Sequence, residues 1–139
     1  MGYKYFLDSD VIIDYLLKRR PFNVPAREIF ILAFNRKIEV ATSSLAISNI
    51  HYISRKQVGR DESLKLIADF LELCKIISVS ELEIREALKS NFFDFEDAIQ
   101  HFSALSDPKI EGIITRNKTD FQKSKLPVFS PEEFLSLFK

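Results

Sequence analysis

Short apolar runs alternate with longer polar-and-apolar stretches along this chain. Four runs have the length and the β-branched or aromatic content of strands. A fifth run contains Pro127, which an edge strand tolerates. The predicted strands are residues 4–7, 38–42, 75–79, 113–115 and 126–129.

Apolar residues recur three and four positions apart between these runs, which predicts helices. Ser9 and then Ser43 or Ser44 are the expected caps of two helices, and Ser80 to Glu83 forms a capping-box pattern. The predicted helices are residues 11–17, 26–36, 45–56, 61–73, 80–90, 95–106 and 130–138.

Strands that alternate with helices favour a parallel sheet with helices on both faces. The predicted fold class is therefore α/β, as a three-layer α/β/α arrangement around a mostly parallel central sheet of four to five short strands. The chain has 139 residues, of which 46% are hydrophobic, and this is the range of one compact domain. We expect a single domain over residues 1–139.

Net charge and cysteine content limit which ligands and which cellular compartment the sequence favours. Twenty basic and twenty acidic residues cancel, so nucleic-acid binding would depend on local contacts. Cys74 is the only cysteine and cannot form a disulfide within the chain, which favours the reducing cytoplasm. The residues after Met1 lack a leader pattern, and no apolar run approaches the roughly 20 residues of a membrane span. We expect a cytoplasmic protein without membrane contact.

Acidic side chains gather at three places where predicted elements meet. Asp8 and Asp10 follow the first strand, Asp94 to Asp97 precede or open a helix, and Asp120 follows the fourth strand. Crevices of parallel sheets form outside the carboxyl ends of the strands, where these segments can converge. Two carboxylates at 4 Å repel by about 1–4 kcal/mol, so a fold that collects them usually also binds a cation.

The residue types favour magnesium or manganese. Both ions take carboxylate oxygens and keep water ligands, a chemistry suited to phosphodiester hydrolysis. The sequence has no glycine-rich phosphate loop of the NTPase or dinucleotide-binding type and no Cys/His cluster for zinc. The pattern therefore indicates a metal-dependent phosphodiesterase.

Four segments in order resemble the PIN-domain family, the ribonuclease fold of VapC-type toxins. Phe-Leu-Asp-Ser-Asp-Val-Ile-Ile-Asp-Tyr-Leu resembles its opening strand, and Ala-Thr-Ser-Ser-Leu-Ala-Ile-Ser-Asn-Ile-His-Tyr-Ile resembles its central helix. Asp-Phe-Glu-Asp-Ala-Ile-Gln-His-Phe-Ser-Ala-Leu resembles the third acidic motif. Ile-Ile-Thr-Arg-Asn-Lys-Thr-Asp-Phe, followed by Leu-Pro-Val-Phe-Ser-Pro, resembles the last. The resemblance extends from end to end of the chain.

This resemblance implies a metal-dependent endoribonuclease that hydrolyses RNA as the toxin of a type II toxin–antitoxin pair. It also implies Mg²⁺ or Mn²⁺ as the cofactor, a cognate antitoxin and a homodimer. Asp8, Asp97 and Asp120 would be the charged metal ligands, with Asn49 and either Asp94 or Asp10 in support. Thr115, Arg116 and Asn117 would be supporting residues at the end of the fourth strand.

Two asparagines depart from the family pattern. Asn49 stands in the central helix where the family usually carries an acid, most often Glu, and Asn117 stands where relatives often have Asp. An amide oxygen can approach a cation or its water shell but adds no charge, so the affinity for metal should fall.

Several alternatives follow from the residues. The asparagines also fit a PIN scaffold with a weakened or lost metal site that binds RNA or protein, and a third reading is a DNA-directed flap-type nuclease. Asp94 is either a helix cap or a ligand, and Arg116 either contacts phosphate or faces solvent. Glu96 and Asp14 are expected on the surface or behind the ligands.

Overall fold

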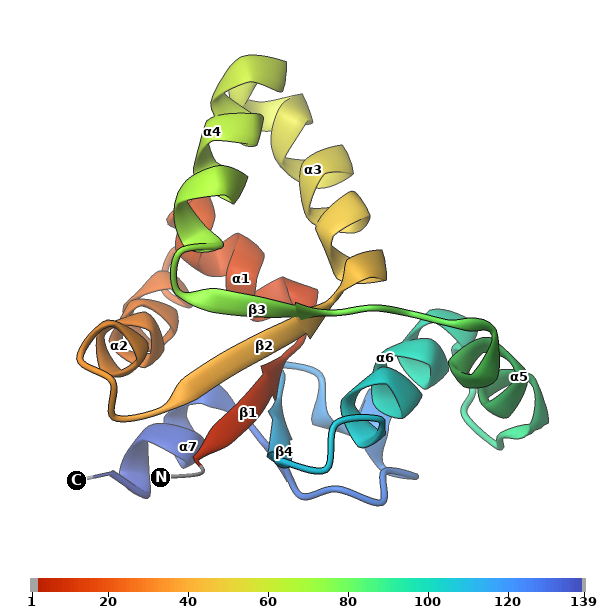
Figure 1. The fold of residues 1–139 in the computed structure, drawn as a ribbon. Helices are drawn as coiled ribbons and strands as arrows, with labels where there is room; N and C mark the ends of the chain where they lie inside the picture. Colours follow the sequence, from red (N-terminus) through yellow and green to blue (C-terminus); the bar gives the residue numbers. More distant parts are fainter. Residues whose placement is uncertain (1–2, 139) are drawn as a thin grey trace.

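The computed structural model describes residues 3–138, in which five strands form one parallel sheet in the order β3-β2-β1-β4-β5. The three-layer α/β/α prediction is confirmed, because helices cover both faces of this sheet (Figure 1). The strands are β1 (Lys4–Leu7), β2 (Glu39–Ser43), β3 (Cys74–Ile77), β4 (Ile110–Ile114) and β5 (Val128–Phe129).

The helices lie close to the predicted ranges, with shifts of a few residues at their ends. Ser43 caps α3, and the capping box that begins at Ser80 is present at the start of α5. The helices are α1 (Ser9–Leu16), α2 (Asn23–Phe34), α3 (Ser44–Val58), α4 (Arg60–Phe70), α5 (Glu81–Lys89), α6 (Phe95–Leu105) and α7 (Pro131–Ser136), with a 3₁₀ turn η1 (Lys118–Phe121).

Alternating side chains of the central strands build two cores. Tyr5 and Leu7 of β1 point into a larger core, which they share with α1 to α4 and α7, whereas Phe6 points into a core shared with α6 and η1. This alternation follows from the two-residue period of a strand. Both faces of the sheet are covered, as is usual for parallel strands.

Gly112 allows β4 and β5 to approach each other closely. A Cβ atom at this position would lie 2.9 Å from the Phe129 ring and 3.0 Å from the Pro127 carbonyl oxygen. The pairing of β1 with β4 also shifts register between Lys4 and Phe6. The irregular strand β4 still delivers its last residues to the carboxyl edge of the sheet, next to the end of β1.

Within residues 3–138, no helix is both long and apolar enough to cross a membrane.

Candidate active site

Asp8 lies at the carboxyl end of β1 and is 7% exposed. Its backbone N–H donates to the Ile114 carbonyl at 3.0 Å, so the β1–β4 ladder extends to this residue. Its Oδ1 accepts from the Ser9 backbone N–H at 2.8 Å, and its Oδ2 accepts from Thr115 Oγ1 at 2.8 Å. The prediction that Ser9 caps α1 was wrong, because the extended backbone of Asp8 places the Asp8 carboxylate over the first turn.

The environment of Asp8 opposes its negative charge. Burial raises the pKa of Asp8, the hydrogen bonds from Thr115 and Ser9 lower it, and the charges of Asp120 and Glu96 raise it again. The net direction is upward. Folding has therefore brought acids from distant segments within electrostatic reach of one another.

Asp10 faces the turn that follows β4. Its Oδ2 accepts from the Arg116 backbone N–H at 3.3 Å and from Asn117 Nδ2 at 3.1 Å. Its Oδ1 is buried and has no hydrogen-bond partner among the described residues. Burial and the charge of Asp8 raise the pKa of Asp10 to about 7. Asn117, which stands where relatives often have Asp, thus donates a hydrogen bond from its amide to the carboxylate of Asp10.

The guanidinium of Arg116 binds Asp14. The Arg116 Nε and Asp14 Oδ2 atoms lie 2.6 Å apart, and Asp14 is 1% exposed. The guanidinium carbon also lies 3.9 Å from the centre of the Phe22 ring. The surface placement considered for Asp14 was wrong, because this buried ion pair holds it against the end of β4. The same pairing occupies the charge of Arg116 within the protein.

Asp94 and Asp97 lie at the start of α6. Asp94 is the helix cap, since its Oδ1 accepts from the Asp97 backbone N–H at 2.9 Å, and its side chain is exposed. Asp97 is partly buried. Burial, followed by the charges of Asp8, Asp94, Asp120 and Glu96, raises the pKa of Asp97 to about 7. Acids from the end of β1, from the turn after β4 and from the start of α6 therefore all disfavour the charged form of Asp97.

Asp120 lies on η1, an element that the sequence patterns did not predict. Its side chain is exposed, and its charge contributes to the raised pKa of both Asp8 and Asp97. The structure therefore brings Asp8, Asp97 and Asp120 into one electrostatic cluster.

Asn49 of α3 contacts α6 across the site. Its Nδ2 donates to Glu96 Oε1 at 2.6 Å. Sequence reasoning placed Glu96 on the surface or behind the ligands and so missed this contact. A signal was present in the sequence, because Glu96 and Gln100 are four residues apart and share a helix face. Gln100 is buried, where its Oε1 accepts from Ser43 Oγ at 2.5 Å.

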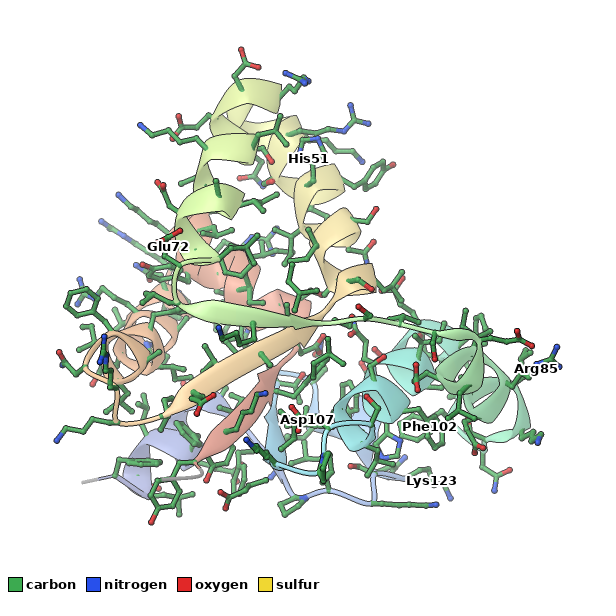
Figure 2. All side chains as sticks on the ribbon, in the orientation of Figure 1. His51, Glu72, Arg85, Phe102, Asp107 and Lys123 are labelled. Atoms are coloured by element: carbon green, nitrogen blue, oxygen red, sulfur yellow. The ribbon has the colours of Figure 1, made fainter. Side chains whose placement is uncertain are left out.

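A cavity of about 310 Å³ opens beside the acidic cluster. Asp94, Asp97 and Asp120 line it, together with Phe93 and Lys123. The Phe93 side chain is fully exposed, at 106%. Figure 2 shows Lys123 on the same side of the sheet as α6. A larger hollow of about 660 Å³ lies at the amino ends of β2 and β3 and contains none of these acids.

Both histidines form hydrogen bonds with residues outside the acidic cluster. His51 of α3 shares a hydrogen bond with Ser63 of α4 at 2.8 Å, and Figure 2 shows it on the far side of the sheet from α6. His101 is buried and accepts from the Lys125 backbone N–H through Nε2 at 3.0 Å. Burial lowers the pKa of His101 to about 4. Carboxylates therefore carry the ionisable chemistry of this edge.

The donor set fits magnesium or manganese in its chemistry. The candidate ligands are all oxygens, and Asp10 presents a buried oxygen without a partner within residues 3–138. In the same range, no three Asp, Glu, His or Cys side chains are already close enough together to hold an ion. Side chains of the cluster would therefore have to move closer together when an ion binds.

The fold has several counterparts among solved structures. One is VapBC2 from Rickettsia felis, described as bound to a DNA fragment from its promoter: it has a TM-score of 0.68 and 18% identity, and the match covers 91% of this chain and 98% of the other. Another is a toxin–antitoxin complex from Klebsiella pneumoniae, with a TM-score of 0.60 and 21% identity. This match covers 91% of this chain and 97% of the other. A third is VapC20 from Mycobacterium tuberculosis, described as a sarcin–ricin loop cleaving toxin, with a TM-score of 0.61 and 14% identity. This match covers 78% of this chain and 86% of the other.

Sequence comparison assigns the family. No curated protein matches the sequence. The family model described as PIN domain matches residues 4–119, which include Asp8, Asp97 and the turn after β4. The match covers most of the chain. The chain therefore belongs to the PIN domain family.

Proposed function

We propose that this protein is a divalent-metal-dependent endoribonuclease that hydrolyses RNA phosphodiester bonds. The observation that carries the proposal is the electrostatic cluster of Asp8, Asp97 and Asp120, three acids from separate segments at the carboxyl edge of a PIN fold. A structural role explains one capping carboxylate, but it does not explain why three acids without an ion-pair partner among residues 3–138 share one edge.

Asp8, Asp97 and Asp120 would hold Mg²⁺ or Mn²⁺, with Asp10 and Asp94 beside them. When bound, the cation supplies charge neutralisation for the phosphodiester and lowers the pKa of water. Thr115 and the Ser9 backbone N–H orient Asp8 by donating to its two oxygens. This leaves further lone pairs of the same carboxylate free for the ion.

The cavity beside the acids supports a single-stranded substrate. The fully exposed Phe93 ring offers a stacking surface for an unpaired base, and Lys123 offers a positive charge for the backbone. Because the chain has no net charge, such local contacts are the means by which it would bind RNA.

A cognate antitoxin is part of the proposal. One structural neighbour is described as a toxin–antitoxin complex from Klebsiella pneumoniae, and another as VapBC2 bound to a DNA fragment from its promoter. We propose that this chain is the toxin of such a pair and that it forms a homodimer, as the family resemblance implies. Sedimentation of the purified chain, alone and with the product of the adjacent reading frame, tests both assemblies. A monomer that does not bind that product would contradict them.

The nuclease assignment is tested by Asp8→Asn. This change removes one charge, keeps the size of the side chain and leaves an amide oxygen that can accept from the Ser9 backbone N–H, so the fold should persist. We expect Mn²⁺-dependent cleavage of single-stranded RNA to fall below detection, measured on labelled RNA by gel electrophoresis. Circular dichroism should match that of the wild type. Unchanged RNA cleavage by Asp8→Asn would contradict the assignment of this site as a metal-dependent nuclease.

Asn49 and Asn117 favour a second function, a PIN scaffold that binds RNA or protein without cleaving it. Both positions lack the acid that the family usually carries, and the acids present are not preassembled around an ion within the described residues. A Mn²⁺ titration followed by the melting temperature separates the two functions. A cation that binds the folded state raises the melting temperature by mass action, whereas a lost site gives no shift.

A further inference from the structure

Glu96 is held across the site by the residue that replaces the family's acid. Asn49 Nδ2 donates to Glu96 Oε1 at 2.6 Å, which joins α3 to α6 over 47 residues of sequence. One helical turn further along α6, Ser43 Oγ donates to the buried Gln100 Oε1. The two contacts fix the face that α6 turns toward α3, and Glu96 lies on that face.

The hydrogen bond leaves Glu96 able to bind a cation. It occupies only Oε1, and Oε2 accepts no hydrogen bond within residues 3–138. An amide donor also adds no positive charge that would neutralise the carboxylate. Asn49 therefore holds Glu96 in place next to the acidic cluster without pairing its carboxylate with a cation.

The charge of Glu96 acts on two of the candidate metal ligands. It contributes to the raised pKa of both Asp8 and Asp97, as does the charge of Asp120. This shared effect on the two acids indicates that Glu96 belongs to the same cluster.

We propose that Glu96 supplies the fourth carboxylate of the site, from α6 in place of α3, and that Asn49 is the positioning residue that holds it there. The inference rests on the proposed function and specifies which residues of that site compensate for the missing acid. The side chain at position 49 then orients a ligand through a hydrogen bond and does not itself supply the charge.

The test is Glu96→Gln, because glutamine separates charge from contact. Its amide oxygen can still accept from Asn49, so the tie between α3 and α6 persists and only the charge is lost. We expect at least a tenfold weaker affinity for Mn²⁺, measured by calorimetry and by the metal-dependent rise in melting temperature. Glu86→Gln, at an exposed position of α5, is the matched control and should bind like the wild type.

A purely structural role for Glu96 predicts a different result. In that case Glu96→Gln would bind Mn²⁺ like the wild type, and this result would overturn the inference. The melting temperature in EDTA checks folding and should stay near that of the wild type, since Glu96 is exposed. Asn49→Ala should also weaken Mn²⁺ binding, and wild-type affinity in this variant would overturn the positioning role.

Asp8→Asn distinguishes failure of the inference from failure of the proposed function. If wild-type protein binds Mn²⁺, and Asp8→Asn abolishes binding while Glu96→Gln does not, only the inference fails. If the wild type neither binds Mn²⁺ nor cleaves RNA, the proposed function fails and the inference falls with it.

Discussion

Asp97 shows how the placement of one carboxylate connects the stability of the protein to its proposed chemistry. It is partly buried and surrounded by the charges of Asp8, Asp94, Asp120 and Glu96, and these conditions raise its pKa to about 7. An ordinary aspartate has a pKa near 3.9. Folding therefore disfavours the charged form that a metal requires. The folded state without metal is less stable than it would be with a neutral side chain at this position.

The pH dependence of this effect has a definite sign. Between about pH 4 and 7 the folded protein retains a proton on Asp97 that the unfolded chain has released, so the contribution of Asp97 to stability falls as pH rises through this window. We expect Asp97→Asn in EDTA to raise the melting temperature at pH 8 and to leave it unchanged near pH 4. Differential scanning calorimetry measures both.

The exposed Asp69→Asn of α4 is the control for this experiment and should show no such pH-dependent gain. An Asp97→Asn variant that is no more stable than the wild type at pH 8 would contradict the electrostatic account. For the same reason, Mn²⁺ should bind the wild type more weakly at pH 6 than at pH 8, because protons compete for Asp97 and for Asp10.

At the scale of elements, the ion pair of Arg116 with Asp14 fixes the end of β4 against α1. Asp14 is buried, and the Arg116 side chain is 26% exposed and also stacks on Phe22. The backbone of the same turn carries Thr115, which binds Asp8, and Asn117, which binds Asp10. The ion pair therefore positions two hydrogen bonds to acids of the site.

Arg116→Ala should destabilise the protein by about 3–5 kcal/mol, because it leaves Asp14 buried without a partner. Urea denaturation followed by circular dichroism measures the loss. Arg85→Ala is the matched control: its ion pair with Glu81 is exposed, as Figure 2 shows for Arg85 at the outer side of α5. The control should lose less than about 1 kcal/mol. If both variants lost the same free energy of unfolding, the buried Arg116–Asp14 ion pair would not have the stabilising role described above.

The sequence was sufficient for the order of the elements, but it did not reveal contacts between them. Short apolar runs and the capping box at Ser80 depend on neighbouring residues, so the strands and the approximate helix ranges could be predicted. The partners of Glu96 and Asp14 lie 47 and 102 residues away, and they depend on how the helices are rotated against the sheet. Local patterns do not encode that rotation. The surface placement considered for Asp14 was therefore wrong, and the contact of the exposed Glu96 with Asn49 was missed.

For the whole molecule, the cavity at the acidic edge sets how a substrate would approach. Phe93→Ala removes the fully exposed ring from that cavity. Stacking contributes about 1–3 kcal/mol per base, so the affinity for single-stranded RNA in EDTA should fall roughly 5- to 150-fold. Fluorescence anisotropy with labelled oligonucleotides measures this affinity. Leu88→Ala, which is 68% exposed on α5 outside the cavity, should bind like the wild type.

Duplex RNA provides the second comparison for Phe93. Its bases are already stacked on one another, so Phe93→Ala should change its affinity little. An equal loss on single-stranded and duplex RNA, or no loss on either, would mean that the ring does not bind a base.

The position of β4 beside β1 has a consequence during protein synthesis. The strand lies between β1 and β5 in the sheet, yet it is the fourth strand to leave the ribosome, and Thr115 and Asp120 follow it. A nascent chain that ends after α6 already contains Asp8 and Asp97, but it lacks the hydroxyl that orients Asp8 and the third acid. If the protein is a nuclease, its own topology keeps the site incomplete until Thr115 and Asp120 have left the ribosome.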